Sequence, residues 1–332
     1  MNSNLISYYD RFSFALHRYT KHFFGINTNS NYLRESILKK ISTNRLGKKI
    51  EIDRIKNFSN QFFFENYLKK NKPVIFKGMA KNWDCVKKWD LDNIKEKYGN
   101  DIIPVMDTIS GGVNSIYNVE TTTLSEVIDA MKIGDDSKYI RFNNLLHAHP
   151  ELIKDFDTEK IFSMRSDFAS GNTFQCFMGA KGTKTELHAA ISHNLFTQVK
   201  GVKEWRLYNS SFDPFLRPPV NGRPYFFTEF DPLKPDYDRF PEVKYLDYYH
   251  FDLEEGDVLY NPSSFWHHVV NKTATIGVGF RWFAPDSIKL NFSQVLLTIT
   301  AKNPSVFYVL RNKRNYSKIF EHIANNSKFK IN

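Results

Sequence analysis

Short runs of apolar and aromatic residues, separated by turn residues, fill the chain between residues 172 and 284. The runs lie at Phe174–Met178, Asn194–Val199, Glu204–Tyr208, Asp257–Asn261 and Ala274–Phe283. Runs this short, bounded by turn signals, are typical of strands. The 30 Phe and 17 Tyr residues of the chain also favour a sheet-rich interior over a helical bundle. The pattern therefore predicts an all-β core, a β-sandwich or a barrel.

The residues of two connections between these runs predict how the chain is connected there. The tight Lys200–Gly201 turn lies between two alternating apolar runs and predicts a hairpin. The turn-rich region from Pro214 to Pro241 is expected to be a long surface connection.

The segment before these strands mixes helix and strand signals, which predicts an α+β lead-in to the sheet. Ser59 and Thr123 are expected to cap helices that run through Tyr67 and Met131, and a third helix over residues 91–98 should end at Gly99. Strands are expected at Ile50–Ile52, Pro73–Phe76, Ile102–Val105 and Lys138–Phe142.

Helical spacing of apolar residues marks both ends of the chain. We expect a helical N-terminal extension over residues 1–49, in which Gly25 ends the first helix, a main domain over 50–285, and C-terminal helices over 286–332. The first helix should pack on the domain, with a membrane surface as the alternative. The C-terminal helices either pack on their own domain or form a homodimer, and we favour the homodimer.

The composition indicates which partners and which cellular compartment to expect. The formal net charge is +10, but the basic residues are scattered, so a nucleic-acid partner is not expected. Cys85 and Cys176 are too few for a disulfide framework, which fits a reducing cytoplasm. No run of about 18 uncharged apolar residues occurs, so the sequence predicts no membrane span.

The candidate metal-binding residues lie in two histidine-containing stretches, Thr185–Ala190 and Phe265–Val269. On a strand, alternate side chains share a face, so His188 and Ala190 should point to the same side. A 2-His-1-carboxylate iron site uses this spacing: a His and an acid two residues apart, and a second His on a distant strand. His188 and His267 supply the histidines, but Ala190 stands at the acid position. Taken alone, His188 is more readily interpreted as a structural histidine than as a ligand, and His267 in its aromatic run is similarly ambiguous.

The surrounding motifs resemble those of the cupin-like/JmjC oxygenases, in particular the asparaginyl-hydroxylase-like members. The motifs occur in the family's order and are Lys72–Gly78, Thr185–His188, Asn194–Tyr208, Pro235–Pro241, Gly256–Pro262 and Trp266–His268. The resemblance covers roughly residues 50 to 285. It implies a double-stranded β-helix, the cupin/JmjC jelly roll, that binds Fe(II) and 2-oxoglutarate and reacts with O2.

The resemblance also implies roles for individual residues. His188 and His267 match the iron-binding histidines, and Lys203 matches the lysine that binds the distal carboxylate of 2-oxoglutarate. Thr185 matches a hydroxyl donor to that carboxylate, and Asn194 a polar residue near the iron. A buried dicarboxylate does need a cation and a hydroxyl partner, although Lys203 could instead be a solvated lysine after the turn.

Ala190 departs from the family, whose members have an iron-binding Asp at this position, and Gly279 replaces a residue that is often polar in relatives. Three readings follow. A chloride or bromide ion fills the gap at Ala190, as in iron/2-oxoglutarate halogenases, which replace the Asp with Ala or Gly. Alternatively, the protein is a non-catalytic binding protein, or Glu186 or His193 completes the metal site and the protein is a hydroxylase. We favour the halogenase, since His188, His267, Lys203 and Thr185 are all retained.

The sequence does not identify the substrate, which could be a small molecule, an amino acid or a peptide. Aromatic residues at 174, 177, 225 and 260 could line a pocket or belong to the core. The basic surface favours an acidic or carrier-bound substrate.

Overall fold

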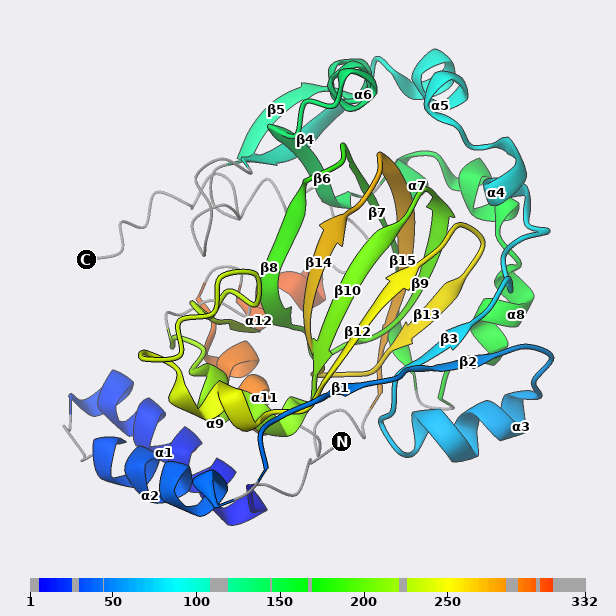
Figure 1. Ribbon diagram of the computed structural model, residues 1–332. Coiled ribbons are helices and arrows are strands. Elements are labelled where there is room, and N and C mark those ends of the chain that lie inside the picture. The colour runs from blue at the N-terminus through cyan, green and yellow to red at the C-terminus, as the bar shows by residue number, and fades with distance from the viewer. Residues whose placement is uncertain are drawn as a thin grey trace.

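The computed structural model describes residues 6–25, 30–43, 45–107, 119–143, 145–166, 169–220, 226–284, 292–302 and 305–312. Two β-sheets form its centre (Figure 1). The six-stranded sheet has the order β1 (Lys49–Ile50), β12 (Tyr248–Leu253), β10 (Lys203–Tyr208), β14 (Trp266–Asn271), β8 (Lys184–Ala189) and β11 (Phe226–Phe227). The nine-stranded sheet has the order β2 (Asp53–Ile55), β3 (Val74–Phe76), β13 (Val258–Asn261), β9 (His193–Lys200), β15 (Thr275–Phe283), β7 (Ser170–Gly179), β6 (Lys138–Asn143), β4 (Ile102–Asp107) and β5 (Val119–Thr123).

The predicted all-β core is confirmed, because every run assigned to a strand between residues 172 and 284 lies in one of these sheets. The turn at Gly201, however, does not close a hairpin. β9 pairs with β13 and β15, whereas β10 pairs with β12 and β14, so the chain passes from one sheet to the other at this turn. Gly201 has a φ of 73°, and a Cβ there would lie 2.2 Å from the carbonyl oxygen of Ala274. Glycine therefore allows the crossing.

The α+β lead-in forms largely as predicted. Ser59 and Thr123 are the N-caps of α3 (Asn60–Phe63) and α6 (Leu124–Ile133), and α5 (Leu91–Tyr98) ends at Gly99. The helix after Ser59 continues as a π-helical turn, Phe64–Leu68. The remaining short helices here are α4 (Asp84–Lys88), α7 (Leu145–Ala148), the 3-10 helix Pro150–Asp155 and α8 (Thr158–Ser163). The single strand expected at Ile50–Ile52 is only partly present: Ile50 ends β1, Glu51 and Ile52 belong to no strand, and β2 begins at Asp53 in the other sheet.

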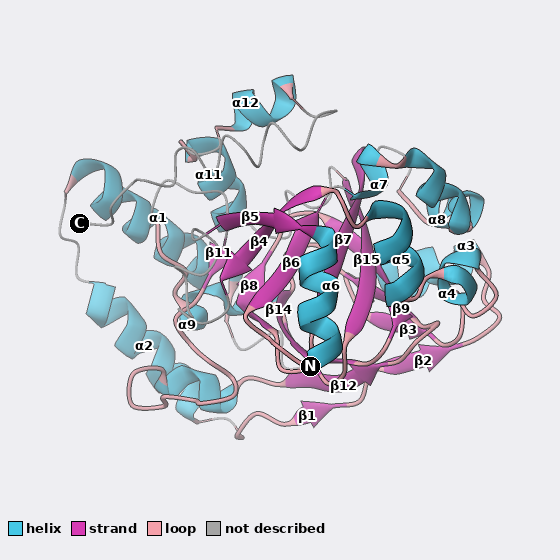
Figure 2. Cartoon of the chain, turned by 90° about the horizontal axis from the view of Figure 1, so that it is seen from above, coloured by secondary structure: helices cyan, strands magenta, loops and turns pink. Residues whose placement is uncertain are grey.

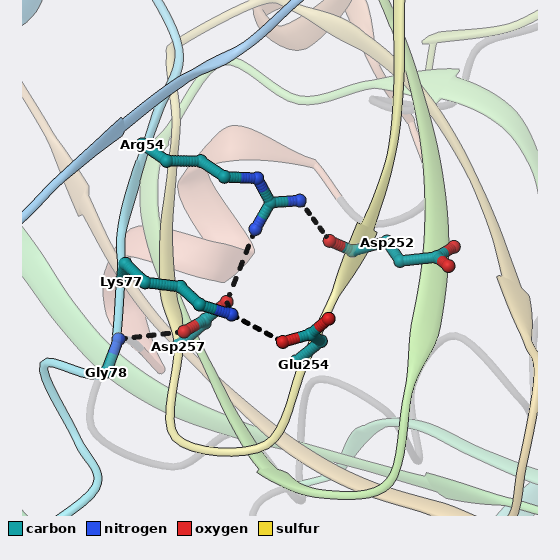
Figure 3. A network of polar contacts seen from close by, with 6 residues as sticks. All are labelled: Arg54, Lys77, Gly78, Asp252, Glu254 and Asp257. Atoms are coloured by element: carbon teal, nitrogen blue, oxygen red, sulfur yellow. Dashed lines mark hydrogen bonds and ion pairs between the residues drawn. The ribbon is translucent and has the colours of Figure 1, made fainter.

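A buried carboxylate, Asp257, ties the lead-in to the turn between β12 and β13 (Figure 3). It accepts a hydrogen bond from the Gly78 backbone N–H at 2.8 Å. Its Oδ2 lies 3.3 Å from Lys77 Nζ and 3.5 Å from an Arg54 guanidinium nitrogen. Lys77 also pairs with the more exposed Glu254. These contacts fasten strands β2 and β3, which form one edge of the nine-stranded sheet, to the turn before β13.

The chain ends add helices to one end of the sheets, as Figures 1 and 2 show. They are α1 (Tyr8–Phe24), α2 (Ser30–Ser42), α11 (Phe292–Thr300) and α12 (Val306–Arg311). Gly25 ends α1 with a φ of 65°, as predicted. Phe14 and Tyr19 are buried, and the Tyr19 hydroxyl donates to the Ser293 carbonyl at 2.8 Å. The first helix therefore packs on the domain, and the helical extensions are confirmed.

Several expectations about the chain ends stay predictions. The C-terminal helices fall partly on residues 285–291, 303–304 and 313–332, which lie outside the described residues. Helix α11 packs against α1 of the same chain. The side chains of Ile299 and Phe307 are 60 % and 79 % exposed. The expected homodimer is untested. The domain boundaries and the cytoplasmic location are also untested. Within the described ranges, no helix has the length and apolar character needed to cross a bilayer.

The connection from Pro214 to Pro241 is not confined to the surface, which corrects the prediction. Its described residues include α9 (Asp213–Leu216) and β11, and it leads into the 3-10 helix Pro241–Tyr245. Phe215, Phe226, Phe230 and Phe240 are buried in a cluster with Trp266. Among the described residues of this segment, the uniformly exposed run is 233–239. The connection packs because its aromatic residues cover β8 and β14.

Candidate active site between the two sheets

His188 on β8 and His267 on β14 lie directly opposite each other on neighbouring antiparallel strands. Their ring centroids are 4.0 Å apart. Both side chains are buried, and both line a narrow pocket whose walls come from the two sheets. The fold therefore brings together two imidazoles that are far apart in the sequence, as a metal site requires.

Both imidazoles are oriented in the same way by the backbone. His188 Nδ1 lies 2.8 Å from the Glu186 carbonyl oxygen, and His267 Nδ1 lies 2.9 Å from that of Phe265. A carbonyl only accepts, so each Nδ1 carries the proton and each Nε2 has a free lone pair. Burial lowers the pKa of His267 to about 3 and that of His188 well below its usual value. Both rings are therefore neutral, which is the form that binds a metal.

Thr185 lines the same pocket as His188 although the two residues are three positions apart. In a regular strand they would face opposite sides. Between the pairs His188–His267 and Thr185–Val269, β8 advances by three residues and β14 by two. This β-bulge places one extra residue in β8 and turns Thr185 to the side of His188.

Lys203, the first residue of β10, is only 1 % exposed. Its Nζ donates to Asn271 Oδ1 at 2.5 Å, and the ring centroid of Tyr139 lies 5.6 Å from Nζ. Among the described residues, no carboxylate forms an ion pair with it, and burial lowers its pKa. A buried cation without a counter-ion is costly, so this position suits an anionic ligand. The reading of Lys203 as a solvated lysine is therefore wrong.

Asn194 on β9 also lines the pocket, and its Oδ1 is buried without a hydrogen-bond partner among the described residues. Gly279 on β15 lies beside it. A Cβ at Gly279 would lie 2.8 Å from Asn194 Oδ1, closer than such contacts occur. The glycine thus makes room for the Asn194 amide.

Ala190 follows the last residue of β8, and its carbonyl accepts a hydrogen bond from the Ser264 N–H at 2.7 Å. No carboxylate takes its place. Glu186 pairs with Arg141 at 3.2 Å, and His193 Nδ1 bonds to the Tyr260 hydroxyl at 2.9 Å. Across the described part of the chain, no three His, Cys, Asp or Glu side chains gather as a metal site would need. The two candidates for a substitute ligand are thus held by other contacts.

Two arginines were not among the site residues expected from the sequence. Arg281 on β15 lines the pocket, opposite Asn194 in the strand register. Arg141 on β6 is buried, and its Nε and Nη2 have no hydrogen-bond partner among the described residues. Both guanidinium groups lie over the Phe142 ring, at 5.5 and 5.3 Å. Both help to lower the pKa values of the two histidines, so the pocket is electropositive.

Aromatic side chains surround the histidine pair. Phe227 of β11 stacks on His188 with ring centroids 5.5 Å apart, and Trp205 stacks on His267 at 5.9 Å. Phe227 was missed because β11 lies in the connection that was expected to be exposed. Of the four aromatic candidates, Phe177 lines the pocket, Phe174 and Tyr260 belong to the core, and Tyr225 lies outside the described residues.

These residues fit the groups that the motifs imply. His188 and His267 offer two neutral nitrogen ligands, one fewer protein ligand than a 2-His-1-carboxylate site. Lys203, with Thr185 close by on the same pocket wall, suits the distal carboxylate of 2-oxoglutarate. The pocket thus offers a cation and a hydroxyl group for one carboxylate of the organic acid, and two of the three protein ligands of a 2-His-1-carboxylate site.

Known proteins with similar sequences agree with this fold. Residues 59–289 match the family model described as a cupin-like domain. Lysine-specific demethylase 8 of Xenopus tropicalis is 25 % identical over 226 residues, which cover 68 % of this chain and 51 % of that protein. Lysine-specific demethylase JMJ30 of Arabidopsis thaliana is 27 % identical over 242 residues, covering 70 % and 54 %.

A third relative is the human bifunctional peptidase and (3S)-lysyl hydroxylase JMJD7, which is 21 % identical over 270 residues, covering 72 % of this chain and 85 % of that protein. This chain spans about half the length of the two demethylases. The family match covers well over half of this chain and contains both sheets' pocket-lining strands. The chain therefore belongs to the cupin-like domain family.

Proposed function

We propose that this protein is an Fe(II)- and 2-oxoglutarate-dependent oxygenase in which an anion from solution takes the place of the missing protein carboxylate. The observation that carries this proposal is the pairing, in one pocket, of two neutral opposed histidines with a buried lysine that lacks a counter-ion. Iron and 2-oxoglutarate, when bound, would supply oxygen activation coupled to decarboxylation of the organic acid.

The side chains of this protein would bind the metal and the organic acid and exclude water. His188 and His267 present Nε2 to the metal, and Lys203 binds the distal carboxylate of 2-oxoglutarate. Phe227 and Trp205 pack on the two imidazoles and exclude water from them. Ala190 is not among the side chains that line the pocket, and its proposed contribution is to omit the carboxylate that the family carries at this position.

The finer proposal is that the anion is chloride or bromide and that the protein is a halogenase. The electropositive pocket supports this proposal. Three cations, Lys203, Arg141 and Arg281, act on it, and Glu186 pairs with Arg141. Such a pocket favours a second anion beside 2-oxoglutarate. A non-catalytic binding protein is the second candidate, supported by the lack of a third protein ligand.

Anaerobic titration of the full chain with Fe(II) and 2-oxoglutarate, with and without chloride, tests both candidates. We expect the metal-to-ligand charge-transfer absorption band of the ternary complex, with a position that shifts on addition of halide. His188→Ala and His267→Ala should each abolish the band. Absence of the band in every condition would exclude the oxygenase, and a band that ignores halide would exclude the halogenase.

A further inference from the structure

A second cavity lies far along the chain from the histidine pocket, where α1 and α2 meet the segment after α9. Figures 1 and 2 both show these three helices together at one end of the sheets. The cavity has a volume of about 390 Å³. Six of its lining side chains are basic: His17, Arg18, Lys21, His22, Arg34 and Arg217. Most of these residues belong to the N-terminal helices, outside the matched family region.

Charge in and around this cavity is unbalanced. Four permanent cations line it, Arg18, Lys21, Arg34 and Arg217. Two buried carboxylates act on them: Glu242 lies 2.5 Å from Arg34 and 3.7 Å from Arg217, and Asp213 interacts electrostatically with Arg18. Neither carboxylate is among the lining residues. Among the described residues, these four positive and two negative charges leave an excess of two positive charges around the cavity.

Three nitrogen atoms around the cavity lack hydrogen-bond partners among the described residues. His17 Nε2, Arg18 Nη1 and Arg217 Nε are buried and make no hydrogen bond with any described residue. Burial lowers the pKa of Arg18 to about 10 and also lowers that of Arg217. A guanidinium keeps its proton even so, and two buried guanidinium donors, Arg18 Nη1 and Arg217 Nε, are costly beside one cavity unless a ligand accepts from them.

Other contacts fix the walls of the cavity. The Arg217 guanidinium lies 4.2 Å from the Phe240 ring centroid and donates to the Arg239 carbonyl. Arg34 donates to the same carbonyl at 3.4 Å. These two arginines are therefore held in place before a ligand arrives, which lowers the entropy cost of binding.

We propose that this cavity binds a phosphate-bearing ligand whose phosphate oxygens accept hydrogen bonds from Arg18, Arg34 and Arg217. A guanidinium matches a phosphate group because its N–H donors are planar and parallel, and a phosphate has enough acceptor oxygens for several donors. A volume of about 390 Å³ exceeds that of a lone ion and leaves room for an attached organic group. The phosphate belongs either to a soluble phosphate ester or to a lipid headgroup.

Calorimetric titration of the full chain with pyrophosphate tests the proposal. We expect binding that weakens about tenfold or more in Arg18→Gln and in Arg34→Gln, since a hydrogen bond to a charged group contributes that much. Lys39→Gln, which removes an exposed charge from α2 outside the cavity, should bind like the parent protein. His188→Ala should also leave binding unchanged, so this result is independent of the proposed oxygenase.

Vesicles of phosphatidylcholine with and without phosphatidic acid distinguish the two sources of phosphate. Co-sedimentation that needs phosphatidic acid and is lost in Arg18→Gln assigns the cavity to a lipid headgroup. Pyrophosphate binding without co-sedimentation assigns it to a soluble phosphate ester. The proposal is overturned by absence of both, or by equal weakening in Lys39→Gln. Thermal unfolding checks that each variant folds, and Lys21→Gln, at an exposed position, replaces any variant that does not.

Discussion

Lys203 Nζ and Asn271 Oδ1 are 2.5 Å apart in the interior of the protein, at directly opposed positions of β10 and β14. Asn271 in turn donates to Thr183 Oγ1 at 2.6 Å and to the Gly179 carbonyl at 3.2 Å. Lys203 thus has a fixed direction, and within the described ranges no carboxylate forms an ion pair with it. A neutral amide orients the ammonium group and leaves its charge for a ligand.

Lys203→Met should weaken 2-oxoglutarate binding about tenfold or more, because it removes a charge-assisted hydrogen bond. The variant should unfold at the same or a higher temperature, since a buried cation without a counter-ion destabilises the free protein. Calorimetric titration and thermal unfolding measure the two effects. Lys200→Met, three residues earlier and paired with Glu255, is the control and should bind normally. Equal loss in both variants would contradict a specific role for Lys203.

Ala190→Asp should raise the affinity for Fe(II) by supplying the third protein ligand. Loss of a partner outside the metal's own ligands already changes affinity about 10- to 100-fold, so a direct ligand should contribute at least about tenfold. Halide should then no longer shift the charge-transfer band, because the carboxylate occupies its position. Ala190→Asn has nearly the same shape without the charge and is the control. An Asp variant with unchanged iron affinity and halide response would show that residue 190 does not face the metal.

Gly279→Ala should disturb the pocket through Asn194. The added methyl group would lie 2.8 Å from Asn194 Oδ1, so the amide must move, at a cost of about 1–3 kcal/mol in the free energy of unfolding. Urea unfolding measures this cost. The double variant Gly279→Ala with Asn194→Ala should recover most of it, because the clash is gone. Additive effects of the two substitutions would mean that the residues do not contact each other.

Asp257→Ala should lower the free energy of unfolding by about 1–3 kcal/mol, because the buried carboxylate accepts the Gly78 N–H and neutralises two cations. Glu254→Ala removes a more exposed partner of Lys77 and should change stability by less than about 1 kcal/mol. Urea unfolding of the two variants gives the comparison. If Glu254→Ala costs as much as Asp257→Ala, then burial does not decide the strength of this network.

Local patterns in the sequence predicted most elements, because they depend on neighbouring residues. The caps Ser59 and Thr123 and the ends at Gly25 and Gly99 are local signals, and the structure confirms all four. The partners of a strand depend instead on the whole chain. The turn at Gly201 therefore looked like a hairpin, although it connects two different sheets.

The candidate site was predictable only where it matched a known motif. His188, His267, Lys203, Thr185 and Asn194 all line one pocket, but their proposed roles stay predictions. Arg141 and Arg281 carried no motif, and only their position within aromatic strands could have suggested burial. Phe227 was hidden in a region whose turn residues indicated a surface loop. Non-local packing decides such cases, and residue spacing alone does not reveal it.

The extra residue in β8 makes the irregular pairing of this strand as important as its composition. Thr185 and His188 share one pocket because three peptide units on β8 match two on β14. Regular pairing of β8 at its present length would turn one of these two side chains away from the pocket. Deletion of a single residue between them would leave them two positions apart, where regular alternation again places both on one face. The hydroxyl and the imidazole therefore share a face only because an odd spacing and a bulge occur together.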